Sequence, residues 1–558
     1  MPEQSQPKEI AIIGGGLAGC LTALMLAKER VVHPDKTTSP KYNITIIEAQ
    51  STVLNGASVV ASRLHLGGEY PLDEVTANDC LKGAVIWKLL MPKGIYTPTP
   101  PMKFLIAQET QEEGKLTETM YKQAYDKIKH NYGIAITKIK YTAGRRTEQK
   151  ETEQKLFGPK EGLFKDLDPK DYADYNQGET EIAAGFRSQE LGLNVPKYLA
   201  MIQHELEAQK NITILTKHKV NENGVYGSLK NKFIIHCQNG TIKEHDGQHK
   251  KFDQVIMSAW RGNPAITPHL DKKKPVTVFK RAMLLVDLPE GWKTPPAFIM
   301  LGQNGGMLAP YNDKIAICYL PTEEAAYRKA FRLTEANGSL PKTWDRLSKD
   351  DRKEWTDRYF ALLKKRFPIL ESAKNPRLLI RDTLSFQQDL TMRRDETVTE
   401  IKAPVMRVIL HTQQEPEVVM TQAHMQHMEA DPYESPLEIK PGVLTIYPTK
   451  ATYSVRAAVQ AAALVNERSE YPERSTLVAL EEDTLDLILR KPSFSLADMQ
   501  ELDPIKDKTY FEKFFKKHRD LAGGWKILEN TWPFQEIPNG TQPWVDRSQG
   551  KGWGLNPI

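Results

Sequence analysis

Residues 9–29 read EIAIIGGGLAGCLTALMLAKE, and their pattern predicts a strand, a tight turn and a helix. Its β-branched run at 10–13 is short and wholly apolar, which predicts a buried parallel strand. Three adjacent glycines follow, and apolar residues then recur at helical spacing, which predicts a helix directly after the turn. The members of that helical stripe are Leu17, Leu21, Leu24 and Met25.

The turn between this strand and helix has the form G-x-G-x-x-G, with Gly14, Gly16 and Gly19 as its glycines. In such a loop the first glycine permits the tight turn, the second lets a pyrophosphate approach the backbone, and the third lets helix and strand pack closely. The backbone N–H groups at the helix start, around Leu17 and Ala18, then face the phosphates. The loop therefore predicts a dinucleotide site.

A second apolar run, at 44–47, ends in Glu48, where an acidic side chain would bind the ribose hydroxyls. Glu48 follows Gly19 at more than the usual spacing of about 20 residues. The additional residues, HPDKTTSP at 33–40, have the composition of a loop, which indicates an insertion between the helix and the second strand. This unit serves both NAD and FAD, so it leaves the choice of nucleotide open.

Length and composition indicate a globular protein of two or three domains, since the chain has 558 residues, of which 40% are hydrophobic and 26% charged. A net charge of +5 is too small to indicate a nucleic-acid partner. The polar start and the lack of a long apolar run predict a cytoplasmic protein. We expect no disulfides and no metal, because the four cysteines are scattered: Cys20, Cys80, Cys237 and Cys318.

Residues 55–71, NGASVVASRLHLGGEYP, resemble a segment of FAD-dependent oxidoreductases of the D-amino-acid oxidase and glycerol-3-phosphate dehydrogenase superfamily. In that superfamily the pattern is similar to G-T-S-S-R-S-T-K-L-x-H-G-G and runs along the flavin. The resemblance implies FAD as the cofactor. The residues that it places near FAD are Ser58, Arg63 and Leu64. His65 stands one place before the superfamily histidine, so that histidine's role is not carried over.

A second resemblance lies at 442–465, GVLTIYPTKATYSVRAAVQAAALV, which looks like the superfamily's late strand, loop and helix. Lys450, Thr452 and Tyr453 match the pattern, whereas Pro448 and Thr449 replace two glycines. The resemblance implies that this loop faces the flavin, where Lys450 would stabilise negative charge on the reduced ring. The alternative is a solvated lysine at a helix start. The implied cofactor contacts are Thr449, Lys450, Ala451 and Thr452.

The middle of the chain supplies a helix at 194–210 and several strands up to 266. It resembles the second half of the superfamily's FAD domain. That resemblance implies that Val220 holds the adenine through its backbone and that Ala259 lies near the adenosine. Trp260 and Arg261 follow where the superfamily usually has a single residue and a glycine, so Arg261 is a candidate for contact with the substrate.

The expected fold class is α/β, with a Rossmann-type FAD-binding domain that is discontinuous in sequence. We expect this domain at 1–80, 190–265 and 430–470. An antiparallel-sheet substrate domain, or cap, would comprise 81–189 and 266–429, where alternating runs predict strands. Residues 471–558 would form a helical, Trp-rich extension. Its aromatic and basic residues indicate contact with a membrane surface or an electron acceptor, the alternative being a packed appendage.

No second glycine fingerprint stands between a strand and a helix, so we expect the electrons to come from a substrate that lies on the flavin. An anionic substrate would need a guanidinium, and the candidates are Arg63, Arg187, Arg261 and Arg381. His65 and Tyr70, just past the flavin-facing segment, are the candidates for groups near the reacting carbon. The alternative for each of these residues is a structural role.

The residues and the resemblance together predict an FAD-dependent oxidoreductase. It would take a hydride from a small polar amine, amino acid or hydroxy compound onto flavin N5, and pass electrons to a quinone, a carrier or O2. An alternative is a protein in which FAD has a structural or RNA-modification role, which the altered loop at Pro448 and Thr449 keeps open. A third is an interaction protein without flavin, which the intact glycines disfavour.

Overall fold

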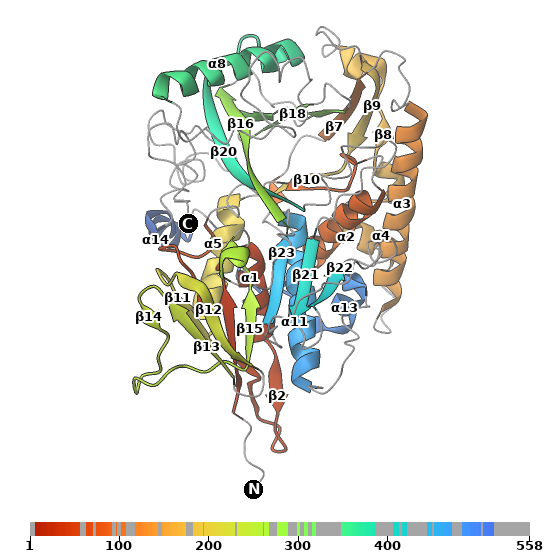
Figure 1. Cartoon of the computed structure of the whole chain (residues 1–558). Coiled ribbons are helices and arrows are strands. Elements are labelled where there is room, and N and C mark those ends of the chain that lie inside the picture. Colours follow the sequence, from red (N-terminus) through yellow and green to blue (C-terminus); the bar gives the residue numbers. More distant parts are fainter. Residues whose placement is uncertain are drawn as a thin grey trace.

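The structure is a computed structural model with two lobes, one around each of two large sheets (Figure 1). It describes residues 6–55, 63–70, 74–91, 96–97, 102–107, 118–142, 148–173, 182–193, 195–228, 232–259, 262–266, 276–287, 298–301, 306–310, 315–319, 348–386, 406–411, 416–420, 443–448, 451–470, 483–503 and 506–517.

The lower lobe in Figure 1 is built on a seven-stranded sheet with the order β11-β4-β1-β15-β23-β21-β22. Its first five strands are parallel, and Ile13 at the end of β1 pairs with both Ile47 and Met257. Strands that lie far apart in sequence thus meet in one sheet. The five are β1 (Lys8–Ile13), β4 (Tyr42–Ile47), β11 (Ile212–Leu215), β15 (Gln254–Met257) and β23 (Val443–Pro448).

Both faces of β1 are buried, which explains its wholly apolar sequence. Ile10 and Ile12 pack in one cluster with the helices α1 (Leu17–Ala27), α5 (Val195–Ala208) and α11 (Ala451–Glu470). Ala11 and Ile13 pack in a second cluster with a three-stranded sheet. That sheet contains β12 (Val220–Ser228), β13 (Lys232–Cys237) and β14 (Gly240–Thr241). This is the three-layer arrangement expected of a Rossmann-type domain.

Two strands extend the seven-stranded sheet beyond β23. β21 (Met406–His411) and β22 (Pro416–Met420) are antiparallel to their neighbours in this sheet. They lie within the range that we expected for the cap, because alternation predicts a strand but carries no information on which sheet it joins. The domain boundaries themselves stay predictions.

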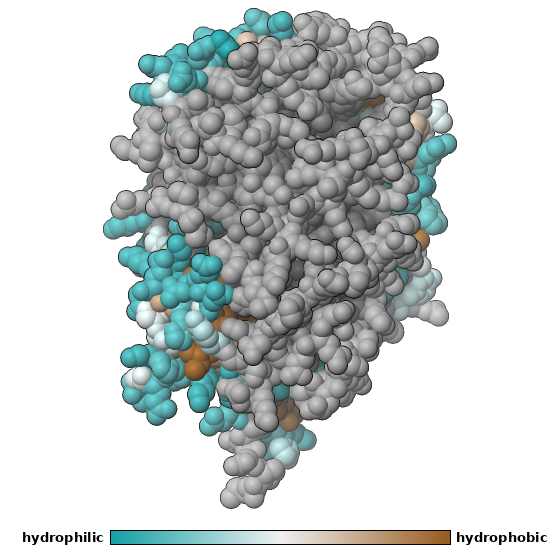
Figure 2. Space-filling model, viewed as in Figure 1, coloured by the Kyte–Doolittle hydropathy of each residue, from teal (hydrophilic) through white to brown (hydrophobic). Residues whose placement is uncertain are grey.

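The upper lobe contains an eight-stranded sheet with the order β20-β16-β19-β18-β17-β7-β9-β8 (Figure 1). It is antiparallel, as predicted, except that β17 and β7 pair in parallel. The strands are β7 (Met102–Ala107), β8 (Lys165–Asp166), β9 (Ile182–Ser188), β16 (Val276–Asp287), β17 (Phe298–Leu301), β18 (Gly306–Pro310), β19 (Ile315–Tyr319) and β20 (Lys374–Phe386). Helix α8 (Lys349–Arg366) lies above them, and Figure 2 shows hydrophilic residues there, at the upper left.

Smaller elements complete the two lobes. A third sheet, with the order β5-β10-β6, lies between them (Figure 1); its strands are β5 (Arg63–Leu64), β6 (Tyr96–Thr97) and β10 (Leu191–Leu193). The insertion predicted at 33–40 forms most of a hairpin, β2 (Arg30–Val32) with β3 (Thr38–Pro40). The helices α2 (Glu74–Leu90), α3 (Glu118–Tyr141) and α4 (Gln149–Lys155) lie together at one side.

The C-terminal extension packs on the lower lobe where the structure describes it, in α13 (Thr484–Arg490) and α14 (Lys508–Lys517). Phe511 and Phe514 of α14 are buried, and Tyr510 packs edge-on against His204 of α5. These rings therefore serve intramolecular packing. The four tryptophans of the extension lie outside the described residues: Trp525, Trp532, Trp544 and Trp553. Among the helices that the structure describes, none is long and apolar enough to cross a bilayer.

Candidate functional site

The candidate site lies at the carboxyl edge of the seven-stranded sheet. The strands β1, β4, β15 and β23 are parallel, so the segments after Ile13, Ile47, Met257 and Pro448 leave at the same edge. Ligands of open parallel sheets bind at this edge.

The loop after β1 passes so close to the loop after β15 that side chains are excluded. Gly14 has a φ of +105°, and a Cβ placed on it would lie 2.5 Å from the backbone of Ser258 and Ala259. A Cβ on Gly19 would lie 2.3 Å from the carbonyl oxygen of Gly14. Gly14 and Gly19 therefore perform the turn and close-packing roles predicted from the sequence.

Helix α1 starts at this loop with an N terminus suited to an anion. Gly16 is its N-cap residue and no side chain caps it; the first turn contains no acidic residue. The positive end of the helix dipole is therefore not neutralised by the helix's own side chains. We call the loop with Gly14, Gly16 and Gly19 the glycine cradle. Together with this loop, the helix end fits a diphosphate held against the backbone at Gly16, Leu17 and Ala18.

Glu48 follows β4 and turns back toward the glycine loop. Its Oε2 accepts a hydrogen bond from the backbone N–H of Gly15 at 2.7 Å, and its Oε1 accepts one from Gln50 at 2.7 Å. Burial raises the pKa of the Glu48 carboxyl, and the hydrogen bonds from Gln50 and Gly15 oppose that rise. The carboxyl group is thus fixed beside the loop, where it can accept hydrogen bonds from a ribose.

Asn263 is a site residue that the sequence analysis missed. Its side chain is fully buried; Oδ1 accepts from the N–H of Ala259 at 2.8 Å, and Nδ2 donates to the carbonyl oxygens of Met257 at 3.4 Å and Ile446 at 3.2 Å. One amide therefore joins the ends of β15 and β23 and holds Ala259 against Gly14. An asparagine after a predicted strand resembles an ordinary turn residue, so no sequence signal distinguished it.

The predicted flavin-facing loop leaves the same edge as the glycine loop. Met257 pairs with both Ile13 and Thr445, so two strand spacings, or about 10 Å, separate the ends of β1 and β23. Thr449 and Lys450 themselves lie outside the described residues, as do Ser58 and Arg261. The side chains of Ala451 and Thr452, at the start of α11, and of Arg381, on β20, are likewise not described.

Two predicted contact residues face the interior. Leu64 is fully buried in the core, and Val220 is buried in the cluster under the three-stranded sheet of β12. For Val220 the predicted contact is through its backbone, so a buried side chain is compatible with that prediction. Its strand follows β11, whose Leu215 accepts a hydrogen bond from the N–H of Glu48 at 2.8 Å. These cofactor contacts stay predictions.

Arg63 lies in a buried group of charges. Its Nη1 is 2.9 Å from Oε1 of Glu69 and 3.2 Å from the sulfur of Met307, and its Nη2 contacts Glu190. Oε1 of Glu190 accepts a hydrogen bond from the N–H of Leu66 at 2.9 Å. The guanidinium is therefore occupied by two carboxylates, which limits its use as an anion receptor.

His65 contacts the charged group of Arg63, Glu69 and Glu190, and Tyr70 follows Glu69 in the chain. Nδ1 of His65 lies 3.2 Å from Oε1 of Glu69 and 3.4 Å from Nη2 of Arg63. The backbone N–H of Tyr70 donates to the carbonyl oxygen of Gly67 at 2.9 Å, and its ring packs against the core. The catalytic roles of His65, Tyr70 and Lys450 stay predictions.

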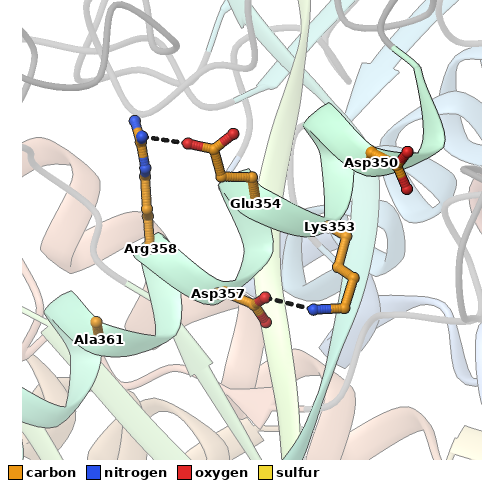
Figure 3. Close-up of a pocket in the computed structure, with 6 residues that line it drawn as sticks. All are labelled: Asp350, Lys353, Glu354, Asp357, Arg358 and Ala361. Carbon is orange, nitrogen blue, oxygen red and sulfur yellow. Dashed lines mark hydrogen bonds and ion pairs between the residues drawn. The ribbon is translucent and has the colours of Figure 1, made fainter.

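A hollow on α8 does not resemble a site. Figure 3 shows its lining of Asp350, Lys353, Glu354, Asp357, Arg358 and Ala361, all from one helix. Lys353 pairs with Asp357 at 2.7 Å, and Arg358 pairs with Glu354. Such pairs one turn apart are typical of a solvated helix face. In the part of the chain that the structure describes, no group of His, Cys, Asp and Glu side chains is arranged to hold a metal.

Comparisons with known proteins agree with this geometry. The sequence model of the DAO family, described as FAD dependent oxidoreductase, matches residues 9–381, more than half of the chain. No curated protein sequence matches.

Solved structures align with most of this chain at low sequence identity. NikD, "an unusual amino acid oxidase essential for nikkomycin biosynthesis", in its open form, aligns with a TM-score of 0.50 at 11% identity over 85% of this chain and 97% of its own. Glycine oxidase from Geobacillus kaustophilus aligns with a TM-score of 0.48 at 12% identity over 85% and 97%. L-proline dehydrogenase from P. horikoshii aligns with a TM-score of 0.47 at 11% identity over 84% and 95%.

Proposed function

The chain belongs to the DAO family of FAD-dependent oxidoreductases, and from this we propose that it oxidises a small polar amine, amino acid or hydroxy compound between its two lobes. The observation that carries the proposal is the carboxyl edge of the seven-stranded sheet, where the glycine loop after β1 and the segment after β23 leave on either side of β15. The cofactor is FAD, which accepts a hydride from the substrate when bound.

The residues of the cradle bind and orient this cofactor in our proposal. Gly14, Gly16 and Gly19 let the diphosphate approach the backbone at the start of α1. Glu48 accepts hydrogen bonds from the ribose hydroxyls. Asn263 keeps the loop after β15 in place. Arg261 and Arg381 are the proposed contacts for an anionic part of the substrate, and His65, Tyr70 and Lys450 the proposed groups near the reacting carbon.

The proposal concerns a class of substrate, a small polar amine, amino acid or hydroxy compound. NikD, with which the chain shares its fold, is by its title an amino acid oxidase, which is compatible with an amine or amino acid here. The electron acceptor is proposed to be O2, a quinone or a carrier protein. In our proposal the two walls of the substrate site are the discontinuous FAD-binding domain, whose sheet also includes β21 and β22, and the cap.

Anaerobic reduction tests the proposal. We expect the purified protein to be yellow and to be bleached by at least one member of a panel of amino acids, N-methyl amines and hydroxy acids. A yellow protein that no member bleaches, yet NADPH reduces, would contradict the proposal and favour a flavin that serves another role. Bleaching followed by recovery of colour in air would identify an oxidase.

A further inference from the structure

Gly15 stands at the first variable position of the G-x-G-x-x-G loop after β1. Its φ does not lie in the left-handed region, so its backbone conformation alone would accept a side chain. The contacts around Gly15 therefore decide which residue can stand there. Four residues make these contacts, and we call them the Gly15 bracket: Cys20, Glu48, Val53 and Leu54.

The hydrogen bonds of the Gly15 bracket use both polar groups of the Gly15 backbone. Its N–H donates to Oε2 of Glu48 at 2.7 Å. Its carbonyl oxygen accepts from the N–H of Leu54 at 2.7 Å and from the thiol of Cys20, whose sulfur lies 3.3 Å away. Burial raises the pKa of the Cys20 thiol, and the charge of Glu48 raises it further, so the sulfur keeps the hydrogen that it donates.

The carbonyl group of Gly15 fixes the direction of the next N–H group in the chain. A peptide unit is planar and trans, so the N–H of Gly16 points away from the carbonyl oxygen of Gly15. Because Leu54 and Cys20 hold that oxygen, they also fix the N–H of Gly16. In the part of the chain that the structure describes, no backbone group accepts this N–H. Gly16 is the N-cap of α1, where the proposed function places the diphosphate.

Val53 covers Gly15 so closely that a side chain is excluded. A Cβ placed on Gly15 would lie 2.6 Å from Cγ1 and 3.0 Å from Cβ of Val53, and 3.2 Å from Oε2 of Glu48. Val53 is only 2% exposed, so its side chain is held among its neighbours. A side chain on Gly15 would therefore displace either Val53 or the loop itself.

Leu54 has a strained backbone conformation beside Gly15. Its φ is +58°, which is uncommon for any residue except glycine, and its side chain is fully buried in the core cluster that includes Leu17 and Leu21 of α1. Strain of this kind persists only where the surroundings hold a residue in place, and it is frequent at sites that hold a ligand. The hydrogen bond to Gly15 and the buried side chain are two contacts that hold Leu54.

We infer that Val53 and Leu54 are positioning residues for FAD, which keep the peptide between Gly15 and Gly16 in the orientation that offers its N–H to the diphosphate. The inference rests on the glycine cradle of the proposed function and adds two residues from outside the glycine motif. Gly15 itself donates to Glu48 and not to the cofactor. A side chain at Gly15 weakens FAD binding by this account because Val53 forces the loop to move, so a smaller residue in place of Val53 should restore the binding.

The test is a double-mutant cycle on the full chain loaded with FAD. The dissociation constant of FAD is measured from the fluorescence of the flavin that is released on dilution, without any substrate. We expect Gly15→Ala to raise this constant at least tenfold in the wild-type background. In a Val53→Ala background, which lacks Cγ1, the same change should raise it less than threefold.

Val85→Ala is the matched control, because Val85 on α2 is also a fully buried valine. In this background we expect Gly15→Ala to raise the dissociation constant at least tenfold, as in the wild type. If Val53 had only a structural role, Val53→Ala and Val85→Ala would both lower the free energy of unfolding, and the effect of Gly15→Ala on FAD binding would be the same in both.

Val53→Ala alone keeps the inference testable if Gly15→Ala does not fold. This variant should release FAD at least threefold faster than the wild type, and the amide hydrogen of Leu54 should exchange faster with solvent. Val85→Ala should change neither rate. The inference would be overturned by an equal effect of Gly15→Ala in the wild-type and Val53→Ala backgrounds, by normal FAD affinity of Gly15→Ala, or by unchanged FAD release from Val53→Ala.

These outcomes separate the inference from the proposed function. If the cycle shows the expected coupling but no substrate bleaches the flavin, the inference on Val53 and Leu54 holds and the proposed oxidation fails. If a substrate bleaches the flavin but the effects of Gly15→Ala and Val53→Ala are additive, the proposed oxidation holds and the inference fails.

Discussion

The backbone N–H of Gly15 donates a hydrogen bond of 2.7 Å to Oε2 of Glu48. This bond ties the loop after β1 to the end of β4, so the phosphate-binding and ribose-binding parts of the cradle are formed as one unit. The carbonyl oxygen of Gly15 also accepts from the N–H of Leu54 at 2.7 Å, which fixes the start of the segment that leads toward Arg63.

Gly14→Ala should abolish retention of FAD and lower the free energy of unfolding by about 3 kcal/mol. The added Cβ would lie 2.5 Å from backbone atoms, and φ at this position is +105°. FAD content after gel filtration and chemical denaturation would measure the two effects. Gly162→Ala is the matched control, since its Cβ would meet its nearest neighbour at 4.0 Å. Normal FAD retention by Gly14→Ala would contradict the assignment of the cradle.

Asn263→Ala should destabilise the protein by about 3 kcal/mol and weaken FAD binding. The change leaves the N–H of Ala259 and two buried carbonyl groups without their side-chain partner. Urea denaturation and titration with FAD would measure both quantities. A variant with unchanged FAD affinity would show that the loop after β15 is held by other contacts.

Breaking the buried ion pair between Arg456 on α11 and Asp79 on α2 should cost about 3–5 kcal/mol. Nη1 of Arg456 lies 2.6 Å from Oδ1 of Asp79, and both side chains are almost fully buried. Arg456→Met leaves the buried Asp79 carboxylate without the guanidinium that it contacts, whereas the double variant with Asp79→Leu removes both charges. We expect the double variant to recover most of the loss in equilibrium denaturation. An equal loss in both proteins would mean that packing, and not charge, sets the cost.

Asp483 links the C-terminal extension to α2 through Lys82, and its contribution to the stability of the protein should depend on pH. Burial would raise the pKa of Asp483, but the ammonium of Lys82, 2.6 Å away, and the N–H of Leu485 lower it overall. A lowered pKa adds stability above the ordinary value of about 3.9, and this stability is lost as the pH falls through the folded-state value. Asp483→Asn, which keeps the helix cap, should therefore cost about 1 kcal/mol at pH 7.

The same difference should shrink as the pH falls below the ordinary value of about 3.9 and through the lowered folded-state pKa of Asp483, because the carboxyl is then protonated in both states. Urea denaturation of the two proteins at pH 7 and over a series of acidic pH values measures it. A difference that is unchanged at low pH would show that the charge of Asp483 does not stabilise the extension.

Much of the nucleotide-binding lobe could be predicted because its information is local. The apolar run at 10–13, the glycines after it and Glu48 each act within one strand–turn–helix unit, and the structure places them as that unit requires. The insertion at 33–40 forms most of the hairpin of β2 and β3. It could be predicted because an insertion between a helix and a strand need not disturb either element.

The features that the sequence did not predict depend on contacts between residues far apart in the chain. Arg63 appeared from the sequence to be a basic residue near the cofactor, but Glu190 lies 127 positions away and no local pattern reports that pairing. The aromatic residues of α14 suggested a membrane surface, yet Phe511 and Phe514 are buried, because the sequence does not tell a helix face that meets α5 from one that meets lipid. Asn263 was missed for the same reason.

The FAD content of the purified protein tests the central claim most directly. After removal of free flavin, we expect one FAD per chain, with the absorption bands of a flavin, and its loss in Gly14→Ala but not in Gly162→Ala. A colourless protein that takes up no FAD when titrated, while its fold is intact, would contradict the account.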